Sequence, residues 1–257
     1  MDLKLRGKRA LVTGASRGLG RAIATSLVME GCAVTAVARN KERLDDLANS
    51  VENTPGTLDT SVVDLSNAAA IEGLSAVLSK VDILVLNTGG PPAGPVSTTT
   101  DELWMSHFET MFLSAIRLTR LALPGMKQRG YGRILPIVSS GVIQPIPNLG
   151  ISNAIRLALT GWAKTLSGEV AADGITVNCL APGRIATDRV AELDAGKADR
   201  EGVSVEQVRT QSLATIPAAR YGHSEEFASV ATFLASPLAS YVTGGITRID
   251  GGFIKSL

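Results

Sequence analysis

The sequence has few residues that bind metals or form disulfides. Among 257 residues there are two cysteines, Cys32 and Cys179, and two histidines, His107 and His223. None of them forms a Cys-x-x-Cys pair or another spacing typical of a metal site, so we predict no bound metal. Both cysteines lie inside apolar segments, which predicts buried, unreactive thiols in a protein of a reducing compartment.

Long apolar runs and an excess of charge of one sign are also absent. The 25 Lys and Arg residues and 24 Asp and Glu residues give a formal net charge of +1, which provides no electrostatic argument for nucleic acid or an anionic membrane as a partner. No apolar run has the length of a membrane span. The first residues run directly into a predicted strand, without the apolar segment of a secretory signal. We therefore expect a cytoplasmic protein.

Aromatic residues are scarce at 4%, whereas hydrophobic residues make up 45% and glycine contributes 26 residues. This composition suits parallel strands that are covered by helices on both faces. Apolar runs alternate with segments of helical period along the whole chain. Strands are predicted at residues 10–13, 33–38, 57–63, 82–86, 133–138, 175–180 and 246–249, and helices at residues 18–30, 41–53, 68–79, 101–127, 150–172 and 224–235.

The regular alternation of strands and helices predicts one α/β domain that covers residues 1–257. The expected fold class is a single doubly wound parallel sheet of about seven strands, the Rossmann fold, with helices on both faces. No repeat, charge block or low-complexity linker divides the chain. Ligands of such sheets bind beyond the carboxyl ends of the strands, where the strand order reverses. The candidate site residues are therefore those that follow each predicted strand.

A glycine-rich segment follows the first predicted strand and precedes a helix. Glycines permit a tight turn and let the backbone approach a pyrophosphate, and the helix N-terminus supplies free N–H groups. Because the segment lies between a strand and a helix within the first 20 residues, it predicts a dinucleotide site. The residues predicted to bind the cofactor there are Gly14, Ser16, Arg17, Gly18, Leu19 and Gly20.

The end of the second predicted strand favours NADP(H) over NAD(H). NAD enzymes usually have Asp or Glu there to bind the ribose 2′-hydroxyl, whereas Arg accommodates a 2′-phosphate. This chain has Arg39 at that position, and Arg17 in the glycine-rich segment is placed to reach the same phosphate. Two guanidiniums can form charge-assisted, bidentate hydrogen bonds to it. The alternative is that Arg39 is an ordinary solvated charge.

The glycine-rich segment and several later motifs resemble the short-chain dehydrogenase/reductase family, and within it most the 3-oxoacyl-(acyl carrier protein) reductases. The later motifs are Asp64-Leu65, Leu86-Asn87-Thr88-Gly89, Ala181-Pro182-Gly183-Arg184-Ile185-Ala186-Thr187, Tyr241-Val242-Thr243-Gly244 and Asp250-Gly251-Gly252. The resemblance implies adenine contacts from Asp64 and Leu65, although Asp64 taken alone is equally well a helix N-cap. The other cofactor contacts that it implies come from Asn87, Gly89, Pro182, Gly183, Ile185 and Thr187.

The resemblance also implies a catalytic tetrad, which is degenerate here. The family has an Asn in the long fourth helix, a Ser after the fifth strand, and a Tyr-x-x-x-Lys pair on the next helix. The aligned residues of this chain are Met111, Ser139, Ser152 and Arg156, so only the Ser is retained. A Ser hydroxyl is far less acidic than a phenol, while Arg keeps the donors of Lys but cannot relay a proton. The predicted catalytic residues are Ser139, Ser152 and Arg156, with Arg156 also binding the cofactor.

Three functional hypotheses follow from these replacements. The first is an NADP(H)-dependent oxidoreductase that acts on a carbonyl or alcohol, with a water held by Ser139, Ser152 and Arg156 as the proton source. The second is a catalytically silent NADP(H)-binding sensor or pseudo-enzyme. A lyase resembling the halohydrin dehalogenases is less favoured, because those enzymes lack the glycine loop and retain the Tyr. No other tyrosine is an evident replacement, and His107 is predicted to be a surface residue.

Loops rich in proline and glycine are predicted to border the site. The loops at residues 89–95 and 144–147 suit an apolar or acyl carbonyl substrate, and residues 188–215 occupy the place of the family's mobile substrate lid. Pro136 lies inside the fifth predicted strand, which predicts a local distortion just before Ser139.

The resemblance finally implies a homotetramer in which helices 101–127 and 150–172 pack against their symmetry mates. These helices contain more apolar residues than one face of a sheet needs. The residues concerned are Met111, Phe112, Ile116, Leu159, Trp162 and Leu166.

Overall fold

Six parallel strands form the central sheet of the computed structural model, which describes residues 1–256. The strands are β1 (Arg9–Thr13), β2 (Ala33–Ala38), β3 (Thr57–Val62), β4 (Ile83–Leu86), β5 (Gly132–Pro136) and β6 (Ile175–Val177). Their order in the sheet is β3-β2-β1-β4-β5-β6. The strand order reverses between β1 and β4. Doubly wound sheets bind their ligands in the crevice at this point. The predicted fold class is confirmed, with six strands in the central sheet where about seven were expected and a separate pair of strands.

The strand predicted at 175–180 is divided in two. After β6, the chain forms β7 (Cys179–Pro182), which pairs in parallel with β8 (Ile246–Ile249). The division lies opposite Pro136 of the neighbouring strand. In this register any other residue at position 136 would donate its backbone N–H to the carbonyl of Asn178, and proline has no N–H to donate. The distortion predicted for Pro136 thus takes the form of a break in the adjacent strand. A bridge between Ile137 and Leu180 then joins the β7–β8 pair to the end of β5.

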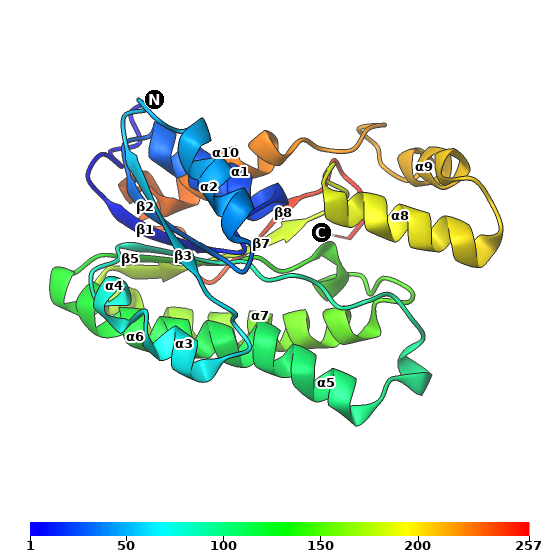
Figure 1. Cartoon of the computed structure of the whole chain (residues 1–257), viewed down its shortest axis with the longest axis horizontal. Coiled ribbons are helices and arrows are strands. Elements are labelled where there is room, and N and C mark those ends of the chain that lie inside the picture. The colour runs from blue at the N-terminus through cyan, green and yellow to red at the C-terminus, as the bar shows by residue number, and fades with distance from the viewer. Residues whose placement is uncertain (257) are drawn as a thin grey trace.

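Helices cover both faces of the sheet, as Figure 1 shows. One face carries α1 (Gly18–Met29), α2 (Lys41–Ser50) and α10 (Ser224–Ala235). The other carries α3 (Ala68–Glu72), α4 (Ser75–Leu78), α5 (Asp101–Phe108), α6 (Ser114–Arg129) and α7 (Gly150–Val170). Short 3₁₀ turns lie at Val96–Thr98, Ser140–Val142, Ala171–Asp173 and Pro237–Ala239.

Each face of the sheet has its own hydrophobic core. Successive strand residues point to opposite faces, so that Val12 and Val85 pack with α1 and α10, whereas Leu11 and Leu84 pack with α6 and α7. No helix among residues 1–256 combines the length and the hydrophobicity that a membrane crossing requires.

Both cysteines are buried and unpaired, as the sequence predicted. Burial raises the pKa of the Cys32 thiol and of the Cys179 thiol to about 12. Both thiols therefore stay protonated near neutral pH, which is the unreactive form.

Three regions differ from the predicted helices, and in one of them the helix predicted at 68–79 is divided into α3 and α4 at Gly73 and Leu74. The helix predicted at 101–127 contains a turn of π-helix at Glu109–Leu113, between α5 and α6, and Phe108 and Phe112 stack across it with ring centroids 4.9 Å apart. Such turns are rare and concentrate at functional sites. Residues 188–215, for which no helices were predicted, form α8 (Asp188–Glu201) and α9 (Val205–Ala214). These two helices project beyond the carboxyl edge of the sheet (Figure 1).

Candidate cofactor and active site

The loop after β1 is closed by contacts that leave no room for side chains at Gly14 and Gly20. Gly14 has a φ of +60°, which favours glycine. A Cβ on Gly20 would lie 2.2 Å from the Gly14 carbonyl oxygen and 2.7 Å from the Asn87 side-chain nitrogen. The predicted phosphate loop therefore forms a tight turn that exposes the N-terminus of α1 to a ligand. Leu19, also predicted to bind cofactor, is half-buried, and its side chain packs against the core.

Asn87 joins the end of β4 to this loop. Its side-chain nitrogen donates to the Gly14 carbonyl at 3.2 Å, and its backbone N–H donates to the Thr13 hydroxyl at 2.8 Å. The Thr13 hydroxyl donates in turn to the carbonyls of Val85 and Asn87, at 3.2 and 2.8 Å. Asn87 was predicted as a cofactor ligand. The structure gives it a direct role in the shape of the phosphate loop.

Of the two arginines predicted to bind a 2′-phosphate, Arg17 lies near acidic residues of α8. Arg17 pairs with Glu192 at 2.8 Å and with Asp188 at 3.4 Å. Arg43, which the sequence analysis missed, pairs with Asp188 at 3.5 Å. Arg39 is exposed beside the start of α2. Arg43 lies in the first turn of α2.

A cleft of about 640 Å³ runs along the phosphate loop between α1, α2, α8 and α10. Several residues predicted to bind the cofactor line this cleft, together with charged side chains of α2 and α8. The lining residues relevant to a cofactor are Ser16, Arg17, Gly18, Arg43, Thr187 and Asp188.

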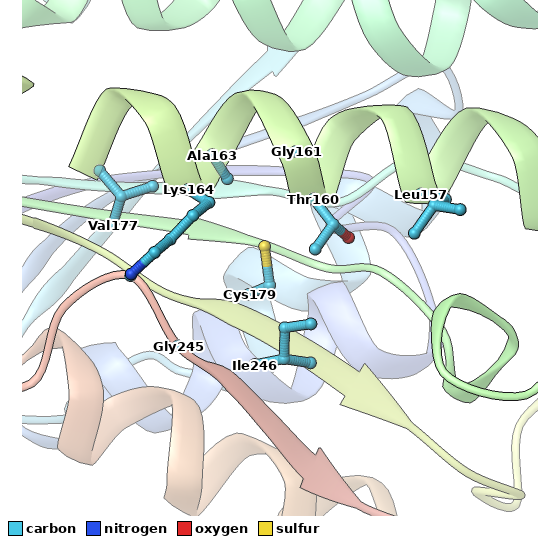
Figure 2. Close-up of a pocket in the computed structure, with 10 residues that line it drawn as sticks. Leu157, Thr160, Gly161, Ala163, Lys164, Val177, Cys179, Gly245 and Ile246 are labelled. Carbon is cyan, nitrogen blue, oxygen red and sulfur yellow. The ribbon is translucent and has the colours of Figure 1, made fainter. Parts of the chain in front are cut away.

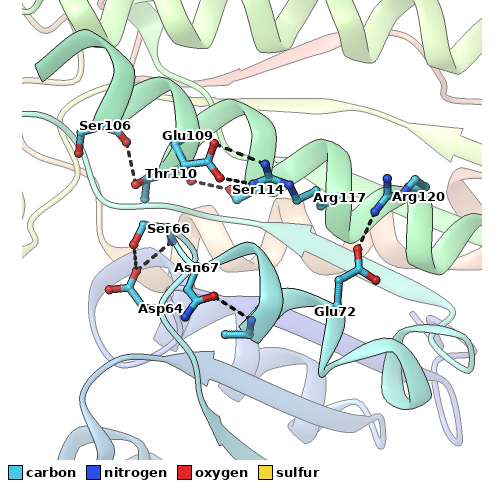
Figure 3. Close-up of polar contacts among 11 residues, drawn as sticks. Asp64, Ser66, Asn67, Glu72, Ser106, Glu109, Thr110, Ser114, Arg117 and Arg120 are labelled. Carbon is cyan, nitrogen blue, oxygen red and sulfur yellow. Dashed lines mark hydrogen bonds and ion pairs between the residues drawn. The ribbon is translucent and has the colours of Figure 1, made fainter. Parts of the chain in front are cut away.

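Asp64 lies beyond the end of β3 in a local turn (Figure 3). Its carboxylate accepts from the backbone N–H and the hydroxyl of Ser66, at 2.9 and 2.8 Å. These hydrogen bonds, and the positive charge of Arg39, lower the pKa of Asp64. The N-cap of α3 is Asn67, so the alternative that Asp64 caps this helix is wrong. Leu65 is buried against the core.

The segment after β7 lies against the phosphate loop. Pro182 is the last residue of β7, the Gly183 N–H donates to β8, and Ile185 is buried. A Cβ on Gly18 would lie 3.4 Å from the Thr187 methyl group, so Thr187 directly borders the loop. The structure thus brings two motifs together that are about 170 residues apart.

Arg156 is buried and binds the ends of two strands. Its guanidinium donates to the Ile137 carbonyl at 2.5 Å and to the Thr88 carbonyl at 3.5 Å. Among residues 1–256 these carbonyls are its only hydrogen-bond partners, and no carboxylate pairs with it. Burial, and next the nearby charge of Arg189, lower the pKa of Arg156 to about 10. Its charged form still predominates at neutral pH.

Both candidate serines precede this arginine in the chain. Ser139 follows β5, and its hydroxyl accepts from the Gly141 N–H at 3.0 Å. Ser152 is buried on α7, one turn before Arg156. Met111, which has the place of the family's Asn, is buried in the π-helical turn and packs with apolar residues of α7. The side chain at position 111 therefore provides no hydrogen-bond donor or acceptor to the candidate active site.

The three tyrosine hydroxyls offer no replacement for the missing phenol. Tyr131 donates to the Ala235 carbonyl at 2.8 Å, at the amino end of β5. Tyr221 donates to Asp194 of α8 at 2.8 Å. Tyr241 is fully exposed.

His107 differs from the surface residue that the sequence predicted. It is half-buried on α5. Burial, together with the positive charge of Arg189, lowers its pKa, so the imidazole is mainly neutral at pH 7. A neutral imidazole has one donor and one acceptor nitrogen.

Sequence comparison relates the chain to known reductases. The family model described as "Enoyl-(Acyl carrier protein) reductase" matches residues 14–254. The 3-oxoacyl-[acyl-carrier-protein] reductase FabG of Salmonella typhimurium is 37% identical over 253 residues, which cover 97% of this chain and 98% of that protein.

Solved structures agree with the sequence matches. L-sorbose reductase from Gluconobacter frateurii, complexed with NADPH and L-sorbose, superposes with a TM-score of 0.93 at 32% identity and covers 100% of both chains. YwfH, an NADPH dependent reductase involved in bacilysin biosynthesis, superposes with a TM-score of 0.92 at 30% identity and covers 98% of this chain and 100% of its own. The family predicted from the motifs is confirmed. The chain belongs to the short-chain dehydrogenase/reductase family of NAD(P)-dependent oxidoreductases.

Proposed function

We propose that the chain is an NADP(H)-dependent oxidoreductase that interconverts a carbonyl compound and its alcohol by an altered route for the proton. One observation carries the proposal. Asn87 donates to the phosphate loop, and the next residue, Thr88, accepts from Arg156. The candidate cofactor loop and the candidate catalytic Arg156 are therefore bound to two consecutive residues, Asn87 and Thr88. A site that binds cofactor and substrate together requires such proximity.

The residues around the cleft fit a phosphorylated dinucleotide. The tight approach at Gly14 and Gly20 leaves the loop backbone and the N-terminus of α1 available to a pyrophosphate. Arg17 and Arg43, which line the cleft, and the exposed Arg39 provide positive charge and donors for a 2′-phosphate. The NADPH complex of the related L-sorbose reductase supports the same choice of cofactor here.

When bound, the nicotinamide supplies or accepts the hydride. As a carbonyl carbon gains the hydride, negative charge develops on its oxygen, and the hydroxyls of Ser139 and Ser152 stabilise this charge by donating hydrogen bonds. Arg156 stays protonated because its pKa, lowered to about 10, still lies above neutral pH. It therefore positions the cofactor ribose, and a water held among these three side chains gives its proton to the oxygen.

A silent NADP(H)-binding sensor is the second candidate. Met111 is buried among Ile151 and Ile155 where the family has a polar residue. Ser152 has replaced the phenol. A sensor would use the same cofactor residues and convert no substrate.

Oxidation of NADPH in the presence of aldehydes, ketones and 3-oxoacyl thioesters separates the two candidates. We expect turnover with NADPH, little turnover with NADH, and a shift of the NADPH-to-NADH preference by about tenfold or more in Arg39→Asp. Binding of NADPH without oxidation by any substrate would favour the sensor. Equal use of both cofactors would contradict the role of the arginines.

The lid and the assembly are also part of the proposal. Residues 188–215, which include α8 and α9, act as a substrate lid, because α8 contacts both the phosphate loop and the loop after β4. A homotetramer is supported by apolar groups that remain uncovered on α7 and around β8, where Leu157 is 54% exposed and Ile246 is 40% exposed. These residues border a pocket of about 480 Å³ between α7 and the β7–β8 pair (Figure 2).

A further inference from the structure

Two arginines from different helices are held on one short loop. Arg156 of α7 donates to the Thr88 carbonyl at 3.5 Å, and Arg189 of α8 donates to the Pro91 carbonyl at 2.5 Å. The two carbonyls are three residues apart, so even a fully extended loop keeps them within about 11 Å. Arg189 also covers Gly90, since a Cβ there would lie 3.2 Å from its guanidinium.

The charges at this loop are not balanced. Arg156 has no carboxylate partner among residues 1–256. The nearest carboxylate to Arg189 is Glu192 at 3.6 Å, and Glu192 lies closer to Arg17, at 2.8 Å. Burying a guanidinium without a counter-ion is costly, so a site of this kind favours an anion from outside the chain.

The loop leaves space for such a ligand. Gly89, between the two anchoring carbonyls, is exposed, and a Cβ built on it would meet no atom within 4 Å. The half-buried His107 of α5 also lies near Arg189, whose charge contributes to the lowering of its pKa. His107 is not acidic, so it adds no negative charge at this loop.

We propose that Arg189, beside the buried charge of Arg156, binds the carboxylate of an anionic carbonyl substrate, such as a 2-oxo acid. This inference rests on the proposed oxidoreductase function and names its substrate class. A planar carboxylate matches the paired donors of a guanidinium, and in a 2-oxo acid it is attached directly to the reacting carbonyl. Reduction adds a hydride to that carbonyl carbon and a proton from water to its oxygen, while NADPH becomes NADP⁺ and the carboxylate is unchanged.

Arg189 is the position for the test, because it is one-third exposed and its loss should leave the fold intact. The matched control is Arg200→Ala, which removes one positive charge from the exposed last turn of the same helix. We expect 2-oxo acids to have a higher kcat/KM than their methyl esters, and Arg189→Ala to remove about 10- to 100-fold of that preference. Arg200→Ala should keep the preference.

A binding measurement makes the inference independent of turnover. Isothermal titration of oxamate, an unreactive 2-oxo acid analogue, into the NADP⁺-loaded protein should give binding that Arg189→Ala weakens about tenfold or more and Arg200→Ala preserves. The affinity of Arg189→Ala for NADPH should stay within about twofold of the parent.

The outcomes distinguish this inference from the proposed function. Oxamate binding that depends on Arg189, without reduction of any carbonyl, would support the carboxylate site and contradict the oxidoreductase. Reduction of esters or phosphorylated carbonyls as efficiently as 2-oxo acids would overturn the carboxylate site and support the oxidoreductase. A tenfold loss of NADPH affinity in Arg189→Ala, with oxamate binding intact, would assign this arginine to the cofactor instead.

Discussion

At the scale of single residues, Gly20 shows how closely the phosphate loop is packed. Ala at this position would place a Cβ 2.2 Å from the Gly14 carbonyl oxygen. We expect Gly20→Ala to lower the free energy of unfolding by about 1–3 kcal/mol and to weaken NADPH binding, because the loop must open to admit the methyl group. The control is Gly168→Ala, in an exposed part of α7 with no atom within 4 Å. It should stabilise by about 0.5–1 kcal/mol, as measured by denaturant unfolding.

Arg156 should contribute to cofactor binding through its charge and its donors. Arg156→Lys should retain most NADPH affinity, whereas Arg156→Ala should weaken it by about 1–3 kcal/mol, the usual effect of removing hydrogen bonds from a charged group. The Ala variant also leaves the carbonyls of Ile137 and Thr88 without this donor, so its thermal unfolding must be measured beside the cofactor titration. Equal losses in both variants would contradict a role for the charge.

The site residues that could be predicted from the sequence are those that directly follow strands or belong to a local motif. Asp188, Arg189 and Glu192 belong to no such motif. Their role depends on where α8 crosses the phosphate loop, and that position is set by tertiary contacts, among them the ion pair between Arg184 and Asp194. Arg189 was missed for this reason.

At the scale of elements, α8 is linked to the phosphate loop by ion pairs that a cofactor phosphate would compete with. Glu192 and Asp188 hold Arg17 in the structure. We expect Glu192→Gln to tighten NADPH binding by about two- to fivefold and to leave NADH binding nearly unchanged, since exposed ion pairs of this kind contribute little. Glu201→Gln, at the end of the same helix, is the control. Weaker NADPH binding in Glu192→Gln would show that the carboxylate assists the cofactor.

The elements themselves could be predicted from hydrophobic periodicity, except where an element is interrupted by a change in backbone hydrogen bonding. The segment 175–180 has the apolar residues of a single strand, but its partner lacks one N–H at Pro136, so it divides at Asn178. The π-helical turn at Glu109–Leu113 shifts the hydrogen bonds of a long helix by one residue. Hydrophobic spacing contains no signal for either feature.

At the scale of the whole molecule, the uncovered apolar surface of α7 and β8 predicts self-association. Of the apolar residues that the sequence placed on helices 101–127 and 150–172, Met111, Leu159 and Leu166 are buried inside the chain and belong to its own core. Leu157 is 54% exposed on α7. Sedimentation should give a particle of four times the 26.7 kDa chain. Leu157→Glu should dissociate it, while Val205→Glu, at an equally apolar exposed site on α9, should not.

A monomer at micromolar concentration would contradict this assembly. A tetramer that persists in Leu157→Glu would move the interface away from this part of α7. Circular dichroism of each variant establishes that the fold is retained.

The measurement that tests the central claim most directly is the transfer of deuterium from NADPH labelled at C4 of the nicotinamide. The protein is incubated with the labelled cofactor and a panel of carbonyl compounds that includes 2-oxo acids, and the products are analysed by mass spectrometry. The account predicts one deuterium on the former carbonyl carbon of a product alcohol, with transfer retained in Arg156→Lys and diminished in Ser139→Ala. Tight binding of NADPH with no deuterium in any product would contradict it and identify the chain as a cofactor-binding protein without catalytic activity on carbonyls.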